Sequence, residues 1–356
     1  MSALAESTVH QPRVQLALSA ALKTGPSHAY LFRGPRGSGK RVAARAFAAE
    51  ILASAAEDAG DARRRALLDP SPHPDLVWLA PKGAQHMVEE VRERVIRAAA
   101  YRPYEGGKRV FVVEAAEAMR DESQNALLKT LEEPPEFVHL ILLSSEPAAL
   151  LETIASRCQP VDFAPLPPEA VEAMLRDAAP GGDADEIAAA ARLSGGDVEL
   201  AGTLLSERGR ALREQAVAMD WSAILSTAEA AGEEAESAAR DALEEEKEAG
   251  VKRSARDIAD AAKRAGRRRR TELLDLGLRL AAAWFRDLAA TAAGAADVVY
   301  NRDRTAQLQS QAAGGDANGP RRAVELVEDT RRRLDLNVSE ELALEALSFR
   351  LSREPT

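Results

Sequence analysis

The sequence predicts an α/β domain with a parallel sheet in its first half, followed by a region made only of helices. Three observations lead to this prediction. Short β-branched apolar runs alternate with helical patterns up to about residue 163, proline and glycine then separate several short helices, and the chain has helical periodicity from about residue 211 onwards. Strands buried on both faces have continuous apolar sequences, and their alternation with helices is typical of a parallel sheet.

Five apolar runs predict the strands of this sheet. They lie at Ala29–Phe32, Leu76–Leu79, Val110–Val113, Leu140–Leu143 and Val161–Phe163. The helical patterns between them lie at Arg41–Leu52, Val88–Ala100 and Ser123–Glu133. The helix that begins near Asp121 should end before Pro134 and Pro135, because proline cannot donate a helix hydrogen bond and restricts the residue before it.

A proline-rich stretch, Pro165-Leu166-Pro167-Pro168, follows the last predicted strand. Proline starts helices but cannot continue them, so we place a domain boundary here. Three short helices are expected next, at Pro168–Ala178, Asp183–Leu193 and Val198–Arg208. The sequence therefore predicts three domains, which are residues 1–165 with the sheet, residues 166–208 with three helices, and residues 209–356 as a helical C-terminal domain.

The C-terminal domain contains a long charged segment. Glu233–Glu248 is mostly acidic and Lys252–Arg270 is mostly basic, so a helix over Ala230–Lys263 would have charges that suit the helix dipole. The arginine run Arg267–Arg270 could contact a phosphate, but we favour a solvated helix face. Three further helices are expected at Leu273–Leu288, Ala323–Leu334 and Glu340–Leu351.

The composition excludes several classes of protein. The chain of 356 residues has a net charge of −10, so as a whole it would repel nucleic acid, and DNA contact would need a local patch or a partner. No apolar stretch is long enough to cross a bilayer and the N-terminus has no secretory pattern, so we expect a cytoplasmic protein without a membrane partner. The single cysteine, Cys158, excludes an internal disulfide framework and a multi-thiolate zinc site.

A glycine-rich loop stands between the first predicted strand and the first predicted helix. Its sequence, Gly34-Pro35-Arg36-Gly37-Ser38-Gly39-Lys40-Arg41, matches the phosphate-loop pattern G-x-x-x-x-G-K-[ST] except at the last position. In that pattern, backbone N–H groups wrap phosphate oxygens, the lysine neutralises the outer phosphates and the final hydroxyl holds Mg²⁺. Arg41 cannot ligate a cation, so the loop predicts a degenerate nucleotide site.

The strand predicted at Val110–Val113 is followed by Glu114 and Ala115. In phosphate-loop ATPases this strand ends with an aspartate for Mg²⁺, often followed by a glutamate that activates the attacking water. Glu114 could take the first role, but Ala115 has no group that accepts a proton, so hydrolysis by this chain alone is not expected. Weak ATP binding without hydrolysis and a glycine-rich turn without any ligand both stay open. The candidate nucleotide-binding residues are Gly34, Gly37, Gly39, Lys40, Arg41 and Glu114.

Two further motifs carry a resemblance to a known family. Asn125-Ala126-Leu127-Leu128-Lys129-Thr130-Leu131-Glu132-Glu133-Pro134-Pro135, followed by Ser156-Arg157-Cys158, resembles the bacterial DNA polymerase III clamp-loader subunits of the AAA+ class. The resemblance implies an AAA+ phosphate-loop domain at 1–165, a small helical lid domain at 166–208 and an all-α collar domain at 209–356. Arg41, Glu114 and Ala115 depart from the ATP-hydrolysing gamma/tau type, and this degenerate site with an intact Ser-Arg-Cys motif is similar to the delta-prime type.

The resemblance also implies a role for each residue of the second motif. Arg157 would be an arginine finger, offered in trans to ATP bound by a neighbouring subunit, with Ser156 and Cys158 on its flanks. A surface salt bridge is the alternative role for Arg157. Cys158 is expected to be a small buried apolar residue rather than a reactive thiol.

The resemblance implies that the chain is a non-hydrolysing scaffold of the clamp loader in DNA replication. The implied partners are gamma/tau and delta subunits in a hetero-oligomeric ring, the sliding clamp, and primer–template DNA through weak or indirect contact. Two other functions stay open. One is an autonomous ATPase, either of the gamma/tau type or another phosphate-loop enzyme, and the other is a DNA-binding protein acting through Arg267–Arg270.

Related subunits commonly carry four cysteines in a zinc module between the first helix and a His-Pro-Asp motif. The corresponding interval here, Ala53–Pro72, contains no cysteine, although His73-Pro74-Asp75 remains. A tetrahedral thiolate site cannot be built from the acidic residues of this interval and one distant cysteine. We therefore expect no zinc, and a short charged helix or loop in place of the module.

Overall fold

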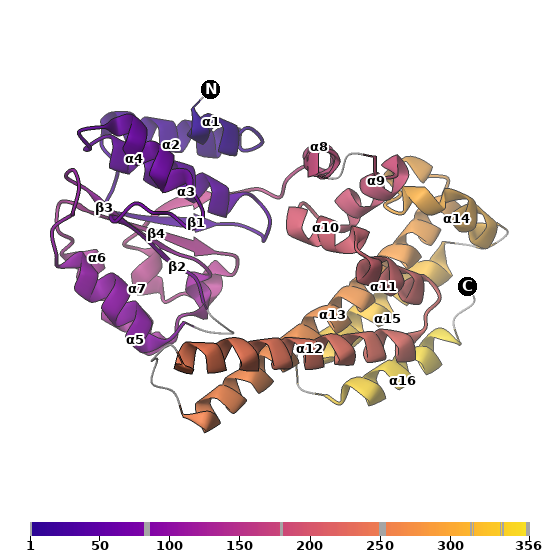
Figure 1. Ribbon diagram of the computed structural model, residues 1–356. Coiled ribbons are helices and arrows are strands. Elements are labelled where there is room, and N and C mark those ends of the chain that lie inside the picture. Colours follow the sequence, from indigo (N-terminus) through magenta and orange to yellow (C-terminus); the bar gives the residue numbers. More distant parts are fainter. Residues whose placement is uncertain are drawn as a thin grey trace. The chain divides into compact units, whose positions relative to one another are not determined.

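The computed structural model describes residues 2–81, 86–178, 181–248, 254–313, 315, 317–334, 336 and 338–353. The chain divides into two compact units, Met1–Pro167 and Pro168–Thr356, which we describe separately (Figure 1). None of the helices in the described ranges is long and apolar enough to cross a membrane.

The first unit is built on a five-stranded parallel sheet with the strand order β2-β3-β4-β1-β5. The strands are β1 (Ala29–Arg33), β2 (Leu76–Leu79), β3 (Arg109–Val113), β4 (Val138–Ser144) and β5 (Gln159–Asp162). The predicted parallel sheet is confirmed, and so are its five strands. Only the last strand is displaced, because its pairing with β1 begins at Gln159 and ends at Asp162, one residue before Phe163.

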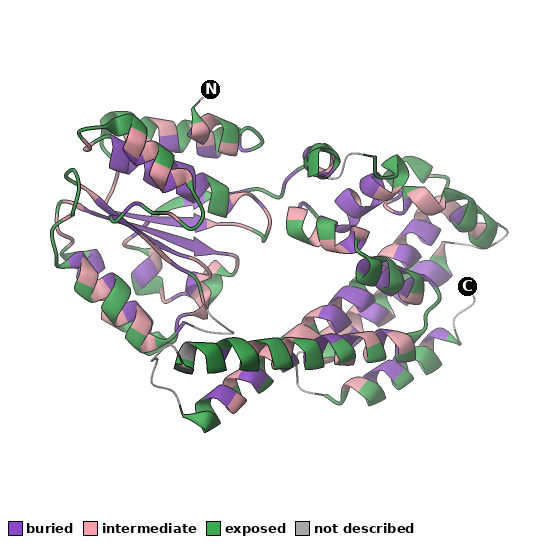
Figure 2. Cartoon of the chain, viewed as in Figure 1, coloured by how far each residue is buried: buried purple, intermediate pink, exposed green. Residues whose placement is uncertain are grey.

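Helices cover both faces of the sheet (Figure 1). One face carries α1 (Ala3–Ser7), α2 (Pro12–Thr24), α3 (Lys40–Ala53) and α4 (Ala59–Leu67). The other carries α5 (Val88–Val91), the π-helix η1 (Arg92–Arg97), the 3₁₀ turns η2 (Ala116–Ala118) and η3 (Pro147–Ala149), α6 (Asp121–Glu132) and α7 (Glu152–Ala155). Strands β3 and β4 are therefore buried throughout and β1 over its first four residues (Figure 2), which explains their continuous apolar sequences.

Aromatic side chains hold the start of the glycine-rich loop in place. The Tyr30 ring packs edge-on against Phe47 with centroids 5.0 Å apart, and Phe32 lies 5.3 Å from Phe163. Gly34 then leaves β1 with φ +153°, and a Cβ there would lie 2.3 Å from the carbonyl oxygen of Phe163. Only glycine fits this close approach. Packing against Phe163 therefore requires glycine at position 34, as the phosphate-loop pattern also does.

The helix α6 ends at Glu132, as the two following prolines predict. Its buried residues include Leu127 and Leu131, which face the sheet. The predicted helix Arg41–Leu52 is confirmed as α3, and the pattern Val88–Ala100 forms α5 and the π-helix η1.

The described part of the second unit contains helices only. They are α8 (Pro168–Ala178), α9 (Ala184–Leu193), α10 (Val198–Leu205), α11 (Glu207–Val217), α12 (Trp221–Glu248), α13 (Ala255–Ala292), η4 (Ala296–Val298), η5 (Arg302–Arg304), α14 (Thr305–Ala312), α15 (Asn318–Leu334) and α16 (Glu340–Leu351). The three predicted short helices are confirmed as α8, α9 and α10. The third is shorter than expected, because Ser206 caps α11 by accepting a hydrogen bond from the Gly209 N–H.

The expectation of one helix over Ala230–Lys263 is wrong. The helix α12 ends at Glu248, and α13 begins at Ala255 after Ser254, which forms a capping box with Asp257. Residues 249–253, and with them Lys252 of the basic run, lie outside the described residues. The two helices run antiparallel and approach closely at Gly232 and Gly266, where a Cβ on Gly266 would lie 2.8 Å from the Gly232 carbonyl oxygen. The acidic and basic runs thus belong to two adjacent helices, and a single helix dipole does not act on both.

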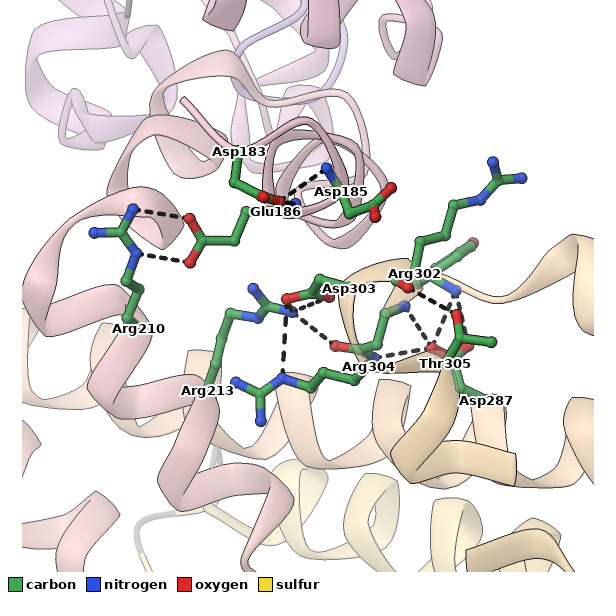
Figure 3. A network of polar contacts seen from close by, with 12 residues as sticks. Asp183, Asp185, Glu186, Arg210, Arg213, Asp287, Arg302, Asp303, Arg304 and Thr305 are labelled. Carbon is green, nitrogen blue, oxygen red and sulfur yellow. Dashed lines mark hydrogen bonds and ion pairs between the residues drawn. The ribbon is translucent and has the colours of Figure 1, made fainter. Parts of the chain in front are cut away.

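A buried carboxylate anchors the segment that follows α13 (Figure 3). Asp287 is fully buried and accepts hydrogen bonds from the backbone N–H groups of Tyr300 and Asn301, at 3.0 and 2.8 Å. Arg213 of α11 donates to Asp303 at 2.9 Å and to the Asn301 side chain at 3.1 Å. These contacts fix residues 300–303 against α11 and α13.

Candidate functional site

The glycine-rich loop wraps around the ammonium group of Lys40. Gly37 and Gly39 have φ values of +66° and +87°, which favour glycine, and α3 begins directly after them. The Nζ atom of Lys40 donates hydrogen bonds to the carbonyl oxygens of Gly34 and Pro35, both at 2.6 Å. It also lies 3.5 Å from the Ser145 hydroxyl oxygen at the end of β4. The lysine of the phosphate-loop pattern is thus held inside the loop by its own backbone.

Arg41 joins the loop to the end of β3. Its Nε atom lies 2.8 Å from the carboxylate of Glu114, and one terminal nitrogen donates to Asp69 at 3.0 Å. The indole N–H of Trp78 donates to the same oxygen of Glu114. The structure therefore brings together Arg41 and Glu114, two of the three residues at which the sequence departs from the ATPase pattern, and it pairs them with each other.

This pairing is incompatible with a magnesium site of the usual phosphate-loop kind. Mg²⁺ needs near-octahedral oxygen ligands, and it dehydrates reluctantly. Here the Glu114 carboxylate is bound by a guanidinium and an indole N–H, and Arg41 provides no oxygen in place of the missing hydroxyl. The residues present do not fit the cation.

A second arginine on the same face of α3, Arg45, shares the carboxylate of Asp69 with Arg41. Arg45 pairs with Asp69 at 2.9 Å, and its guanidinium lies 4.3 Å from the Trp78 ring centroid. Burial lowers the pKa of Arg45, while the Asp69 charge opposes that shift. Sequence reasoning missed Arg45, Asp69 and Trp78. The spacing of Arg41 and Arg45 by four residues was the available signal, since it places both side chains on one helix face.

Glu117, the second glutamate after β3, has a structural contact. The carboxylate of Glu117 accepts a hydrogen bond from the Ser145 backbone N–H at 3.1 Å. It therefore braces the turn after β4, whose Ser145 hydroxyl faces Lys40. Ala115, at the position where ATPases place the catalytic glutamate, has a left-handed φ of +45°.

The two family-like motifs meet through one ion pair. Arg157 follows α7, and its terminal nitrogens donate to the Thr153 carbonyl oxygen at 2.9 Å and to Glu132 at 2.5 Å. Glu132 is the last residue of α6, so this pair joins the 125–135 motif to the 156–158 motif. The Arg157 side chain is 35% exposed. Among the described residues, no hydrogen bond or ion pair joins Arg157 to the glycine-rich loop.

The neighbours of Arg157 have structural roles. The Ser156 hydroxyl donates to the Thr153 carbonyl oxygen at 3.3 Å. Cys158 is buried in the core under α6, and burial raises its thiol pKa to about 12. This agrees with the expectation of a small buried residue, because such a thiol is protonated at neutral pH.

The interval without cysteines forms the short charged helix α4, as expected. Asp58 caps its first turn by accepting from the Asp61 N–H at 2.9 Å, and Arg63 pairs with Glu50 at 2.9 Å. Across residues 2–81, 86–178, 181–248 and the later described ranges, no three His, Cys, Asp or Glu side chains are grouped as metal ligands would be.

The arginine run Arg267–Arg270 lies on α13, where three of its four residues pair with carboxylates. Arg268 and Arg269 lie 2.9 and 3.7 Å from Glu272, and Arg270 lies 3.0 Å from Glu229. These pairs favour the solvated helix face over a phosphate-binding patch.

The first unit is similar in sequence to known subunits of bacterial DNA polymerase III. Residues 10–167 match the family described as "DNA polymerase III, delta subunit". The "DNA polymerase III subunit delta'" of Pseudomonas aeruginosa is 38% identical over 198 residues, covering 53% of this chain and 58% of that protein. The protein of the same name from Bacillus subtilis is 34% identical over 171 residues, covering 46% and 51%. The "DNA polymerase III subunit gamma/tau" of Mycobacterium bovis is 37% identical over 172 residues, covering 47% and 30%. The chain spans about half the length of the delta-prime relatives that it matches.

Proposed function

We propose that the chain is a non-hydrolysing, delta-prime-type subunit of a bacterial clamp loader. The match of residues 10–167 to the family described as "DNA polymerase III, delta subunit" and the similarity to two delta-prime subunits support this proposal. The chain would hold one place in a hetero-oligomeric ring and assist ATP-driven loading of the sliding clamp onto primed DNA. The observation that carries this proposal is the ion pair between Arg41 and Glu114. Because phosphate-loop ATPases use these two positions to hold Mg²⁺, a chain that pairs them with each other is not expected to hydrolyse ATP.

The proposal also gives Arg157 the role of an arginine finger that acts in trans. A guanidinium carries five N–H donors, and its contacts with Glu132 and Thr153 leave donors that can face a phosphate. An arginine offered to the ATP of a neighbouring subunit would stabilise the transition-state charge, and such fingers contribute about 10³–10⁵ in rate. Glu132 would then hold Arg157 in place before the neighbour docks.

The assembly would follow the three-domain division of the sequence. Residues 1–165 would form the AAA+ domain, with a degenerate nucleotide site at Gly34, Gly37, Gly39, Lys40, Arg41 and Glu114. Residues 166–208 would form the lid and residues 209–356 the collar through which the ring assembles. Gamma/tau and delta subunits and the sliding clamp would be the partners, with weak or indirect contact to primer–template DNA, in the cytoplasm.

The proposal is tested by reconstitution with gamma/tau and delta subunits. Arg157→Ala should lower the steady-state ATPase activity and the clamp-loading rate of the complex, because it removes a finger of the kind that contributes about 10³–10⁵ in rate at the site that it reaches. Lys40→Ala should change both rates little, because Lys40 would act on no hydrolysed nucleotide. Arg102→Ala removes another exposed arginine of the first unit and is the control. Equal effects of Arg157→Ala and Lys40→Ala, or a larger effect of Lys40→Ala, would refute the assignment.

The alternative function is an ATPase of the gamma/tau type, which the similarity to a gamma/tau subunit favours. It predicts steady ATP turnover by the purified chain alone, abolished by Lys40→Ala. Turnover that is absent in the isolated chain, while the reconstituted complex is active, leaves only the delta-prime function.

A further inference from the structure

We propose that a groove between α13 and α15, in the second unit, is the docking site for an acidic amphipathic helix of a partner protein. The groove has a volume of about 780 Å³, and Arg192 and Leu193 at the end of α9 also line it. It is built within residues 192–331 and involves none of the residues of the nucleotide loop. The inference does not depend on the nucleotide site, although the groove lies in the part of the chain that we assign to the lid and the collar.

The dimensions of the groove suit a helix. Its α13 wall runs from Leu276 to Ala293, and its α15 wall from Arg321 to Arg331. Arg331 near the end of α15 donates to Asp275 of α13 at 2.7 Å and joins the two walls. At 1.5 Å per residue, the α13 wall is roughly 25 Å long, which matches a helix of about 17 residues.

The floor of the groove is apolar, and small side chains stand in it beside Leu276 and Leu280. Ala283 and Ala290 lie seven positions apart on α13, and therefore on one face of that helix, and both are only partly buried. Val324 of α15 and Tyr300 also line the groove, and Tyr300 is held by the hydrogen bond of its N–H to Asp287. Small floor residues let a second helix axis approach to about 8 Å, at the close end of the usual range.

The rim of the groove carries an excess of positive charge. Five arginines line it, with two glutamates, whereas the whole chain has a net charge of −10. The arginines are Arg192, Arg279, Arg286, Arg321 and Arg331, and the glutamates are Glu325 and Glu328.

Two of the five arginines are already engaged. Arg331 pairs with Asp275 and with Glu328, and Arg286 lies 3.7 Å from the Tyr300 ring centroid and 3.1 Å from Asp287.

The other three arginines, one from each of the helices around the groove, are available to a ligand. Among the residues that the structure describes, none forms a hydrogen bond or an ion pair with the guanidinium of Arg192, Arg279 or Arg321. The Nε atom of Arg192 is moreover buried without a hydrogen-bond partner. A ligand that brings carboxylates to both sides of an apolar stripe would satisfy these groups.

An amphipathic helix has this chemistry. Apolar residues spaced by three, four and seven positions would fill the floor, and glutamates on either flank would reach the rim arginines. Nucleic acid would satisfy the arginines but would leave the alanine and valine floor without an apolar partner. The combination of charge and floor therefore favours an acidic helix.

The probe for the test is a synthetic, fluorescently labelled peptide of about 17 residues with leucine along one helix face and glutamate on both flanks. Its binding to the full chain is measured by fluorescence anisotropy at two salt concentrations. We expect binding that weakens as salt rises, and no binding of a peptide in which lysine replaces every glutamate. Binding of single-stranded DNA to the groove, with no binding of the glutamate peptide, would overturn the proposal.

Charge reversal at the rim provides the first variant. The double variant Arg279→Glu and Arg321→Glu should weaken binding of the glutamate peptide at least about tenfold. Arg256→Glu is the matched control, because Arg256 is 91% exposed near the start of α13 and outside the groove. Equal losses in the double variant and the control would show non-specific attraction and would overturn the proposal.

A substitution in the floor tests whether the peptide binds in the groove or is held only by electrostatic attraction. Ala283→Trp fills the floor without changing charge, and it should also weaken binding at least about tenfold. Thermal unfolding followed by circular dichroism establishes that each variant is folded, and if the double variant is not, Ala283→Trp decides. Unchanged peptide affinity in folded Ala283→Trp would overturn the proposal.

Discussion

At the scale of single residues, Arg41 connects the start of α3 with two other parts of the first unit. Its guanidinium contacts Glu114 after β3 and Asp69 after α4. Both pairs are partly exposed, with the Arg41 side chain 52% exposed, so each contributes little to stability and their effect is mainly on what else Glu114 can bind.

Replacing this arginine should restore a cation site. Arg41→Thr supplies the hydroxyl of the phosphate-loop pattern and releases Glu114 from its ion pair. We expect the variant to bind ADP at least about tenfold more tightly with Mg²⁺ than without it, whereas the parent chain shows no such dependence. Isothermal titration calorimetry with both proteins provides the measurement. ATP turnover should stay absent because Ala115 is unchanged, and a variant without Mg²⁺ dependence would contradict the role we give to Arg41.

Buried histidines should make the first unit less stable in mild acid. Burial lowers the pKa of His139, whose Nδ1 lies 2.9 Å from the Ser27 carbonyl oxygen, and the charges of Lys108 and His28 lower it further. The unfolded chain then takes up a proton near pH 6.5 while the folded chain stays neutral to lower pH, so protonation favours unfolding.

The stability from His139 is therefore complete above about pH 6.5 and is lost as the pH falls through the lowered pKa of the folded state. Urea unfolding at pH 7.5 and 5.5 should show this loss, and His139→Asn should reduce the difference between the two values. Burial shifts the pKa of His73 and His86 in the same direction, so the variant should remove only part of the effect. An unchanged difference in the variant would exclude His139 as a contributor.

At the scale of elements, the sheet could be predicted from sequence because its central strands β3 and β4 are buried along their whole length. In a domain where such runs alternate with helices, a continuous apolar run such as Leu140–Leu143 predicts a buried strand of a parallel sheet. The glycine-rich loop could be found because its residue types are imposed by backbone geometry at Gly34 and Gly39. The ion pair of Arg41 with Asp69 could not, since the two residues are 28 positions apart and are brought together only by the packing of α3 against α4.

The break between α12 and α13 was missed for a local reason. The alanine-rich and charged residues on both sides favour helix, and the local signal for a new helix is only the Ser254-x-x-Asp257 capping box. The close approach of Gly232 and Gly266 shows that these two helices are built to pack together.

Enlarging one of these glycines should separate the two helices. A Cβ on Gly266 would lie 2.8 Å from the Gly232 carbonyl oxygen, so Gly266→Ala should lower the free energy of unfolding by about 1–3 kcal/mol. Gly202→Ala in α10 is the matched control, because its Cβ would meet nothing within 4 Å, and it should raise the free energy of unfolding by about 0.4–1 kcal/mol. Urea unfolding gives both values, and a loss in Gly202→Ala equal to that in Gly266→Ala would contradict the packing argument.

At the scale of the whole molecule, each unit has its own hydrophobic core. Phe47 and Leu127 belong to the two clusters on either side of the sheet, and Trp284 belongs to the cluster of the helical unit. The clusters of the first unit include no residue beyond Phe163.

The first unit should therefore fold when it is produced alone. A fragment of residues 1–167 should have the far-ultraviolet circular dichroism of an α/β protein and should unfold cooperatively in urea. Phe47→Ala, which empties the centre of one cluster, should lower its free energy of unfolding by about 3–5 kcal/mol. A fragment with gradual, non-cooperative unfolding would show that the first unit depends on the rest of the chain.

The positive charge beside Glu114 is covalently attached to the chain, unlike a bound ion, and it cannot diffuse away. The guanidinium of Arg41 stays attached at any concentration of free magnesium, and a chelator cannot remove it. The positive charge at the end of β3 is therefore supplied by the fold itself and does not depend on a bound ion.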